Sequence, residues 1–129
     1  MSEASQADRA LEAYEAGRDA FAAGDLDAAI EHLQASTDAH PHFKALELLG
    51  EAWLRKGEPV RAIVPLAAAT ALNAQVRAPA LLAEALLALG DELEAHRMAK
   101  IALDRDPHNK KACAVLEATT PAFESWNKL

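Results

Sequence analysis

The fold is decided by a glycine-led stretch that reads Gly24-Asp25-Leu26-Asp27-Ala28-Ala29-Ile30-Glu31-His32-Leu33. It returns as Gly57-Glu58-Pro59-Val60-Arg61-Ala62-Ile63-Val64-Pro65-Leu66, and more loosely as Gly90-Asp91-Glu92-Leu93-Glu94-Ala95-His96-Arg97-Met98-Ala99. The three leading glycines recur every 33 residues, and Ala29, Ala62 and Ala95 keep the same step. Self-similarity at a fixed period of this size indicates a repeat architecture.

The segments around these stretches have helical periodicity and carry no strand signal. We expect helices over about 5–23, 25–39, 43–56, 59–72, 75–89 and 91–105, a seventh from Asp106-Pro107 to Ala118, and a short last one from Thr120-Pro121. A proline inside the fourth helix, Pro65, predicts a local kink there. Half of the residues are hydrophobic, but many of these are alanines, which favour thin interfaces between helices.

Charge excludes several classes of partner. The net charge is −7, and residues 1–43 hold 9 acidic side chains against 2 basic ones. Such a chain repels the phosphate backbone, so nucleic-acid binding is disfavoured, and no basic amphipathic face favours a membrane surface. No apolar run is long enough to span a membrane, and the N-terminus lacks the features of a signal peptide, so we expect a cytoplasmic protein.

The pattern resembles the tetratricopeptide repeat (TPR) family. In the middle repeat the signature positions are Leu46, Leu49-Gly50, Trp53, Ala62 and Leu66. The flanking repeats keep the same offsets, although the period is one residue shorter than usual and Ala74 replaces a closing proline. The resemblance implies a single all-α solenoid over 1–129. Its expected parts are three TPR-like helix pairs at about 10–42, 43–75 and 76–109, a capping helix at 110–118 and a short tail helix at 119–129.

The resemblance also implies a function, because the first helices of such repeats line a concave groove that binds a peptide or a partner helix. The predicted function is a non-catalytic protein–protein interaction module. Carried over by position, the partner-binding groove comprises Tyr14, Arg18, Phe21, Lys44, Glu47, Glu51, Leu54, Arg55, Arg77, Glu84, Leu87 and Lys110. These residues would give the groove an apolar strip, a basic edge and two carboxylates in the middle. For each single cation, a solvated ion pair with Glu47 or its neighbours is the simpler interpretation.

One known subset of the family clamps the C-terminal carboxylate of a peptide with Lys, Asn and Arg side chains. The corresponding positions here hold Tyr14, Arg18, Glu51, Arg77 and Leu81. A carboxylate at Glu51 would repel the ligand's own carboxylate, so this mode is disfavoured. A partner with mixed charge and apolar anchors fits better.

No pattern in the chain predicts catalysis or a bound cofactor. His40-Pro41-His42 could reach one metal ion, but nothing completes a zinc ligand set, so we expect no metal. The only cysteine, Cys113, cannot form an intrachain disulfide, and no base is spaced to activate it. We therefore expect no enzyme activity.

The tail carries two aromatic residues, Phe123 and Trp126, which lie three apart and share a helix face. They could cover the end of the solenoid or mediate self-association into a homo-oligomer. Two alternatives to the interaction module stay open: a substrate-specific chaperone for a secreted or membrane protein, as in small bacterial members of the family, and a self-associating structural subunit.

Overall fold

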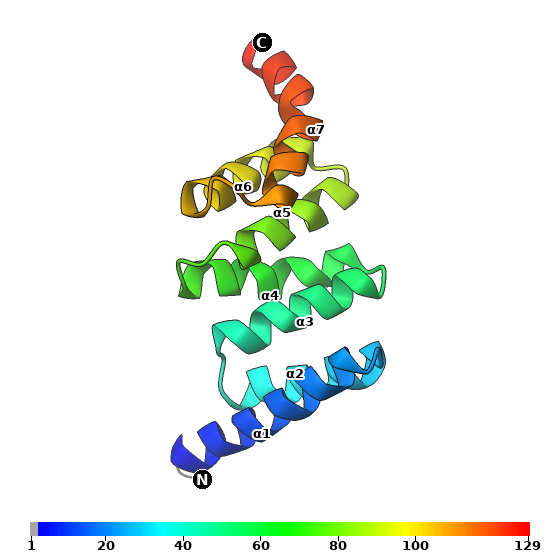
Figure 1. The fold of residues 1–129 in the computed structure, drawn as a ribbon, viewed down its shortest axis with the longest axis vertical. Coiled ribbons are helices and arrows are strands. Elements are labelled where there is room, and N and C mark those ends of the chain that lie inside the picture. Colours follow the sequence, from blue (N-terminus) through cyan, green and yellow to red (C-terminus); the bar gives the residue numbers. More distant parts are fainter. Residues whose placement is uncertain (1–2) are drawn as a thin grey trace.

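The computed structural model describes residues 3–129 and consists of helices in this range, with no strand (Figure 1). Their bounds are α1 Glu3–Ala22, α2 Leu26–Ala39, α3 Phe43–Arg55, α4 Pro59–Leu72, α5 Arg77–Ala88, α6 Glu92–Arg105 and α7 Lys110–Asn127. Successive helices stack antiparallel along the long axis, with the two ends of the chain at opposite ends of the stack. The all-α solenoid of helix pairs predicted from the repeat is confirmed.

The recurring glycines make the turn inside each helix pair. Gly24, Gly57 and Gly90 have φ values of 81°, 84° and 82°, in the left-handed region that other residues avoid. At the first turn the N–H of Gly24 donates to Phe21 and that of Asp25 donates to Ala20, and the other two turns repeat this bonding. This is the Schellman ending of a helix. The carboxylates of Asp25 and Asp91 then cap α2 and α6, whereas Pro59 opens α4 without a side-chain cap.

Close approach within each pair depends on two further glycines. A Cβ at Gly17 would lie 2.7 Å from Leu33 Cγ, and a Cβ at Gly50 would collide with Leu66 Cγ. Leu33 and Leu66 are fully buried at these contacts, beside the buried alanines Ala29 and Ala62. The thin, alanine-lined helix interfaces suggested by composition are therefore present at the two pairs.

The C-terminal part differs from the sequence expectation in two ways. The seventh helix begins at Lys110 rather than Pro107, because Asp106 accepts the N–H of His108 in a turn and Asn109 then caps the helix by accepting the N–H of Ala112. The expected boundary between a cap and a separate tail helix is wrong, since α7 continues through Pro121 to Asn127. Just before the proline, the hydroxyls of Thr119 and Thr120 donate to the carbonyls of Val115 and Leu116 one turn earlier.

Candidate functional site

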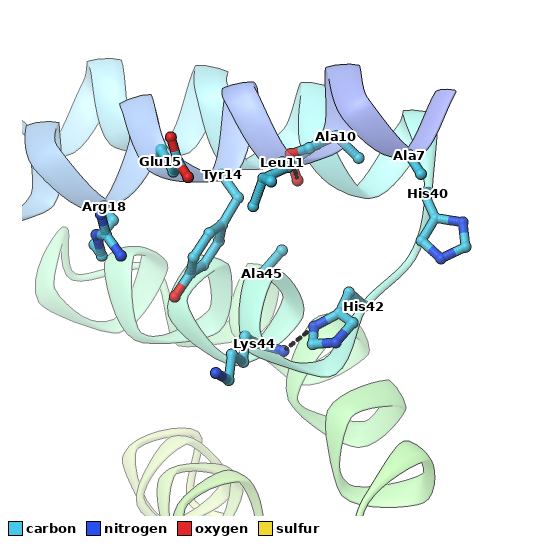
Figure 2. A pocket seen from close by; sticks show the side chains of 11 residues that line it. Ala7, Ala10, Leu11, Tyr14, Glu15, Arg18, His40, His42, Lys44 and Ala45 are labelled. Atoms are coloured by element: carbon cyan, nitrogen blue, oxygen red, sulfur yellow. Dashed lines mark hydrogen bonds between the residues drawn. The ribbon is translucent and has the colours of Figure 1, made fainter. Parts of the chain in front are cut away.

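A pocket of about 370 Å³ lies where α1 passes over the start of α3 (Figure 2). Tyr14 and Arg18 stand four residues apart on α1 and therefore share one face. Tyr14 projects from α1 toward α3, and Lys44 lies opposite it in the first turn of α3. The structure thus brings three of the predicted groove residues, Tyr14, Arg18 and Lys44, to one pocket.

Apolar surface and unpaired positive charge meet in this pocket. Leu11 is 55% exposed beside Tyr14 and supplies apolar surface. The Arg18 guanidinium lies 5.8 Å from the centroid of the Tyr14 ring, within cation–π range. Across residues 3–129, no ion pair engages Arg18 or Lys44. The arrangement can hold an apolar side chain with an acidic group near it.

The rim of the pocket is set by the link between the first two repeats. His42 caps α3, its Nδ1 accepting the backbone N–H of Lys44 at 3.1 Å, and its ring stacks on Phe43 with centroids 4.7 Å apart. The buried Ser36 hydroxyl donates to the carbonyl of Ala10 at 2.7 Å, which ties α2 to α1 behind the pocket. The sequence did not predict His42 or Ser36 as pocket residues, because neither matches a groove position carried over from the family.

A second cluster of predicted residues forms an ion network between α3 and α5. Glu51 is buried, and its two carboxylate oxygens accept from Arg55, at 3.1 Å, and from Arg77. Arg77 Nε also lies 3.4 Å from Glu47 Oε1. Arg77 is therefore engaged in ion pairs with its neighbours, the simpler of the two interpretations offered for it.

Burial dominates the electrostatics of Glu47. Its Oε2 is buried and has no hydrogen-bond partner among the described residues. Desolvation raises the pKa of Glu47 above its ordinary value, and the charge of Arg77 opposes that rise. The middle of the predicted groove therefore holds carboxylates that are already partly compensated.

The remaining predicted residues are divided between packing and the edge of the groove. Arg55 lies 4.4 Å above the ring of Phe21, which joins α3 to α1. Leu54 and Leu87 are partly buried and pack against the main apolar core. Glu84 pairs at 2.8 Å with Lys111, a residue that sequence analysis missed, whereas its neighbour Lys110 is exposed without an ion pair in the described chain. The 33-residue step leads from Arg77, the first residue of α5, to Lys110, the first residue of α7.

The two tail aromatics have different surroundings. Phe123 stacks on His96 of α6, with ring centroids 4.3 Å apart, and Lys100 Nζ lies 5.5 Å from its ring. Trp126 is 58% exposed. His96 is buried, and its Nδ1 is 2.8 Å from the Thr119 hydroxyl, which itself donates to Val115. Burial, with the nearby charge of Lys100, lowers the pKa of His96, so α7 is held to α6 by a neutral imidazole.

The described part of the chain carries neither a metal-ligand cluster nor a helix of membrane-spanning character. In residues 3–129, no three His, Cys, Asp or Glu side chains gather in a way that could hold a metal ion. Among the helices that the structure describes, none combines the length and apolarity that crossing a bilayer demands.

Comparison with known proteins identifies the family. The sequence profile of the tetratricopeptide repeat family matches residues 14–79, which is more than half of the chain. The chain therefore belongs to the tetratricopeptide repeat family. No curated protein matches its sequence.

Solved structures agree with this assignment. The first TPR domain of Spaghetti (RPAP3), bound to the HSP90 peptide SRMEEVD, is 26% identical with a TM-score of 0.85, and the match covers 92% of this chain and 95% of that one. The first TPR domain of human RPAP3 is 26% identical, with a TM-score of 0.79 and coverage of 93% and 96%. The C-terminal TPR domain of a Plasmodium falciparum FK506-binding protein has a TM-score of 0.86 at 16% identity, covering 100% and 97%.

Proposed function

We propose that this chain is a non-catalytic protein-interaction module that binds a peptide or a helix of another protein in the groove along α1, α3 and α5. The observation that carries the proposal is the pocket between α1 and α3, where apolar surface at Leu11 and Tyr14 adjoins the unpaired cations Arg18 and Lys44. The pocket is lined by these two cations and by one carboxylate, Glu15, so in a chain with a net charge of −7 it offers an acidic ligand a locally positive site.

The ligand that fits has an apolar or aromatic anchor with an acidic group beside it. The anchor would lie against Leu11 and Tyr14, where its burial would remove apolar surface from water. The acidic group would pair with Lys44 or Arg18 at the rim. Rim charges of this kind raise the association rate and the specificity more than the affinity.

The structural neighbour bound to SRMEEVD supports peptide binding as the general activity. We infer that this chain does not hold a C-terminal carboxylate in the manner of the clamping subset of the family. Tyr14 and Leu81 stand at two of the clamp positions, and Arg77 at a third is already paired with Glu47 and Glu51. We therefore expect SRMEEVD itself to bind this chain weakly compared with an internal sequence of the stated chemistry.

The test is a selection from a random linear peptide library, followed by fluorescence anisotropy with the enriched peptides. The double variant Leu11→Ser with Lys44→Glu removes apolar surface and reverses charge at two exposed positions, and the expected loss of affinity is at least tenfold. The matched control, Leu129→Ser with Lys128→Glu, makes the same changes at the exposed C-terminal end and should bind like the wild type. Equal loss in both variants, or none in the first, would refute groove binding.

Reversing Arg77 is a poor probe of this groove. Arg77→Glu would place a third carboxylate beside Glu47 and Glu51, which are both largely buried. Any loss of binding would then report a loss of folding.

A further inference from the structure

The outer face of α4 is apolar and open. Val60 is 68% exposed, Val64 76% and Leu72 57%, and Ala67 and Ala71 are exposed between them. From Ala62 to Val76 the sequence contains no charged side chain. Packing within the described chain does not account for this face, because the side of α4 that contacts α3 and α5 is formed by other residues, Ala62, Pro65, Leu66 and Ala69.

The spacing on this face is that of a helix–helix seam. Val60, Val64, Ala67 and Ala71 follow one another at steps of four, three and four residues. This is the alternation that keeps an apolar stripe facing a second helix along several turns. Small residues at half of the positions allow the two backbones to approach closely.

The order of large and small residues on this face indicates which helix packs against it. We propose that it is α4 of a second copy of this chain, packed antiparallel about a two-fold axis. In that register Val60 lies opposite Ala71 of the second copy, and Val64 lies opposite Ala67. Every large side chain then meets a small one, which is the self-complementarity that a two-fold interface requires. A parallel pair would place valine on valine and alanine on alanine.

The groove beside α4 and the position of the charged residue of α4 are compatible with this antiparallel register. Ala67 and Ala71 form one wall of a groove of about 440 Å³ between α4 and α6, whose floor includes Leu82 and Leu86 of α5, so the facing valines have room to enter. Arg61, the only charged residue of α4, lies opposite Thr70 in the antiparallel pair rather than opposite itself. Two copies that each carry a net charge of −7 meet here on a strip of α4 that is uncharged from Ala62 to Leu72, while the other wall of the groove, on α6, carries Glu94, Arg97 and Arg105.

The dimer should be weak, because one helix pair buries less surface than a standard interface. We expect a dissociation constant of about 10 µM to 1 mM, measured by sedimentation equilibrium of the full chain over that concentration range. Val64→Glu should leave the chain monomeric throughout, because the carboxylate would be buried against its partner. Leu129→Glu, at a 96% exposed position outside the seam, should dimerise like the wild type.

Cross-linking tests the register, using chains in which Cys113→Ala removes the native thiol. A mixture of Val60→Cys and Ala71→Cys chains should give mixed disulfide dimers on oxidation, and neither chain alone should cross-link. In the antiparallel pair Val60 of the two copies lies about 16 Å apart along the axis, beyond disulfide reach. A wild-type chain that stays monomeric, a dimer that survives Val64→Glu, or disulfides formed by the Val60→Cys chain alone would each overturn the proposal. Circular dichroism of each variant checks that the fold is retained.

Discussion

Arg77 at the start of α5 donates to the carboxylate of Glu51 on α3, so one ion pair joins the first helices of consecutive repeats. The two residues were predicted to lie in the same groove, but as a basic edge and a central carboxylate with separate roles. The charges in the middle of the groove are therefore paired with one another across the two repeats. The predicted groove cations without an ion pair among the described residues are Arg18 and Lys44 at the α1–α3 pocket and Lys110 at the start of α7.

Removing Arg77 should destabilise the protein more than removing an exposed cation. Arg77→Ala would leave Glu51 with one partner instead of two and Glu47 with none, and both carboxylates are largely buried. Because Arg77 itself is about half exposed, we expect a loss of about 1–3 kcal/mol in the free energy of unfolding, measured by urea denaturation. The control is Arg61→Ala, which breaks an exposed pair with Glu58 and should cost about 0–1 kcal/mol. Equal losses would contradict the structural role of Arg77.

Glu47 should make stability fall as pH rises. Its pKa in the folded chain is raised above 4.5 by burial, so between that value and the raised one the folded chain holds a proton that the unfolded chain has released. The free energy of unfolding therefore declines across this window. Glu47→Gln lacks the titration, so its stability relative to the wild type should increase from pH 4 to pH 7. A difference that is constant with pH would show that burial does not control this carboxyl group.

His96 should make stability fall as pH decreases, which is the opposite of the effect of Glu47. Burial lowers its pKa below 6.5, so the unfolded chain takes up a proton on acidification before the folded chain does, and stability is lost as pH falls through about 6.5. We expect the Tm to fall between pH 7.5 and 5.5 and the fall to be smaller in His96→Gln. His32→Gln, the same substitution at an exposed position on α2, is the matched control. If both variants keep the wild-type slope, His96 is not the titrating group.

A side chain at position 50 should destabilise the protein while Leu66 is present. The added methyl group of Gly50→Ala collides with the buried Leu66 side chain, and overpacking of this kind costs about 1–3 kcal/mol. Thermal unfolding of Gly50→Ala and of Gly50→Ala with Leu66→Ala measures the coupling. The second substitution should cost less in the Gly50→Ala background than in the wild type. Simple additivity of the two losses would exclude the contact as the cause.

The architecture could be predicted from the sequence because the pattern of a helix pair occurs in it three times. Gly24 and its equivalents predicted the turns inside the helix pairs. The continuation of α7 through Pro121 was not predictable from proline alone. A proline in a helix removes one N–H but does not by itself decide where the helix ends.

The site was only partly predictable, because position in a repeat gives the face of a residue but not its partner. Position in the repeat assigned Tyr14, Arg18 and Lys44 to the lining of the groove, among twelve residues, but did not set these three apart from the rest. The pairing of Glu84 with Lys111 was missed, because the 33-residue step from Arg77, the first residue of α5, leads to Lys110, the first residue of α7, and not to Lys111. The burial of Glu47 depends on how α5 lies against α3, which no local pattern encodes.

The most direct test of the central claim is to map the bound peptide on the protein by NMR. A peptide enriched from the random library is titrated into the ¹⁵N-labelled chain, and shifts of the backbone amides are followed. Groove binding predicts that the largest shifts fall on α1 and the first turn of α3, around Tyr14, Arg18 and Lys44, and that they vanish in the Leu11→Ser, Lys44→Glu variant. Largest shifts on α2, α4 and α6, with α1 and α3 unchanged, would contradict the account.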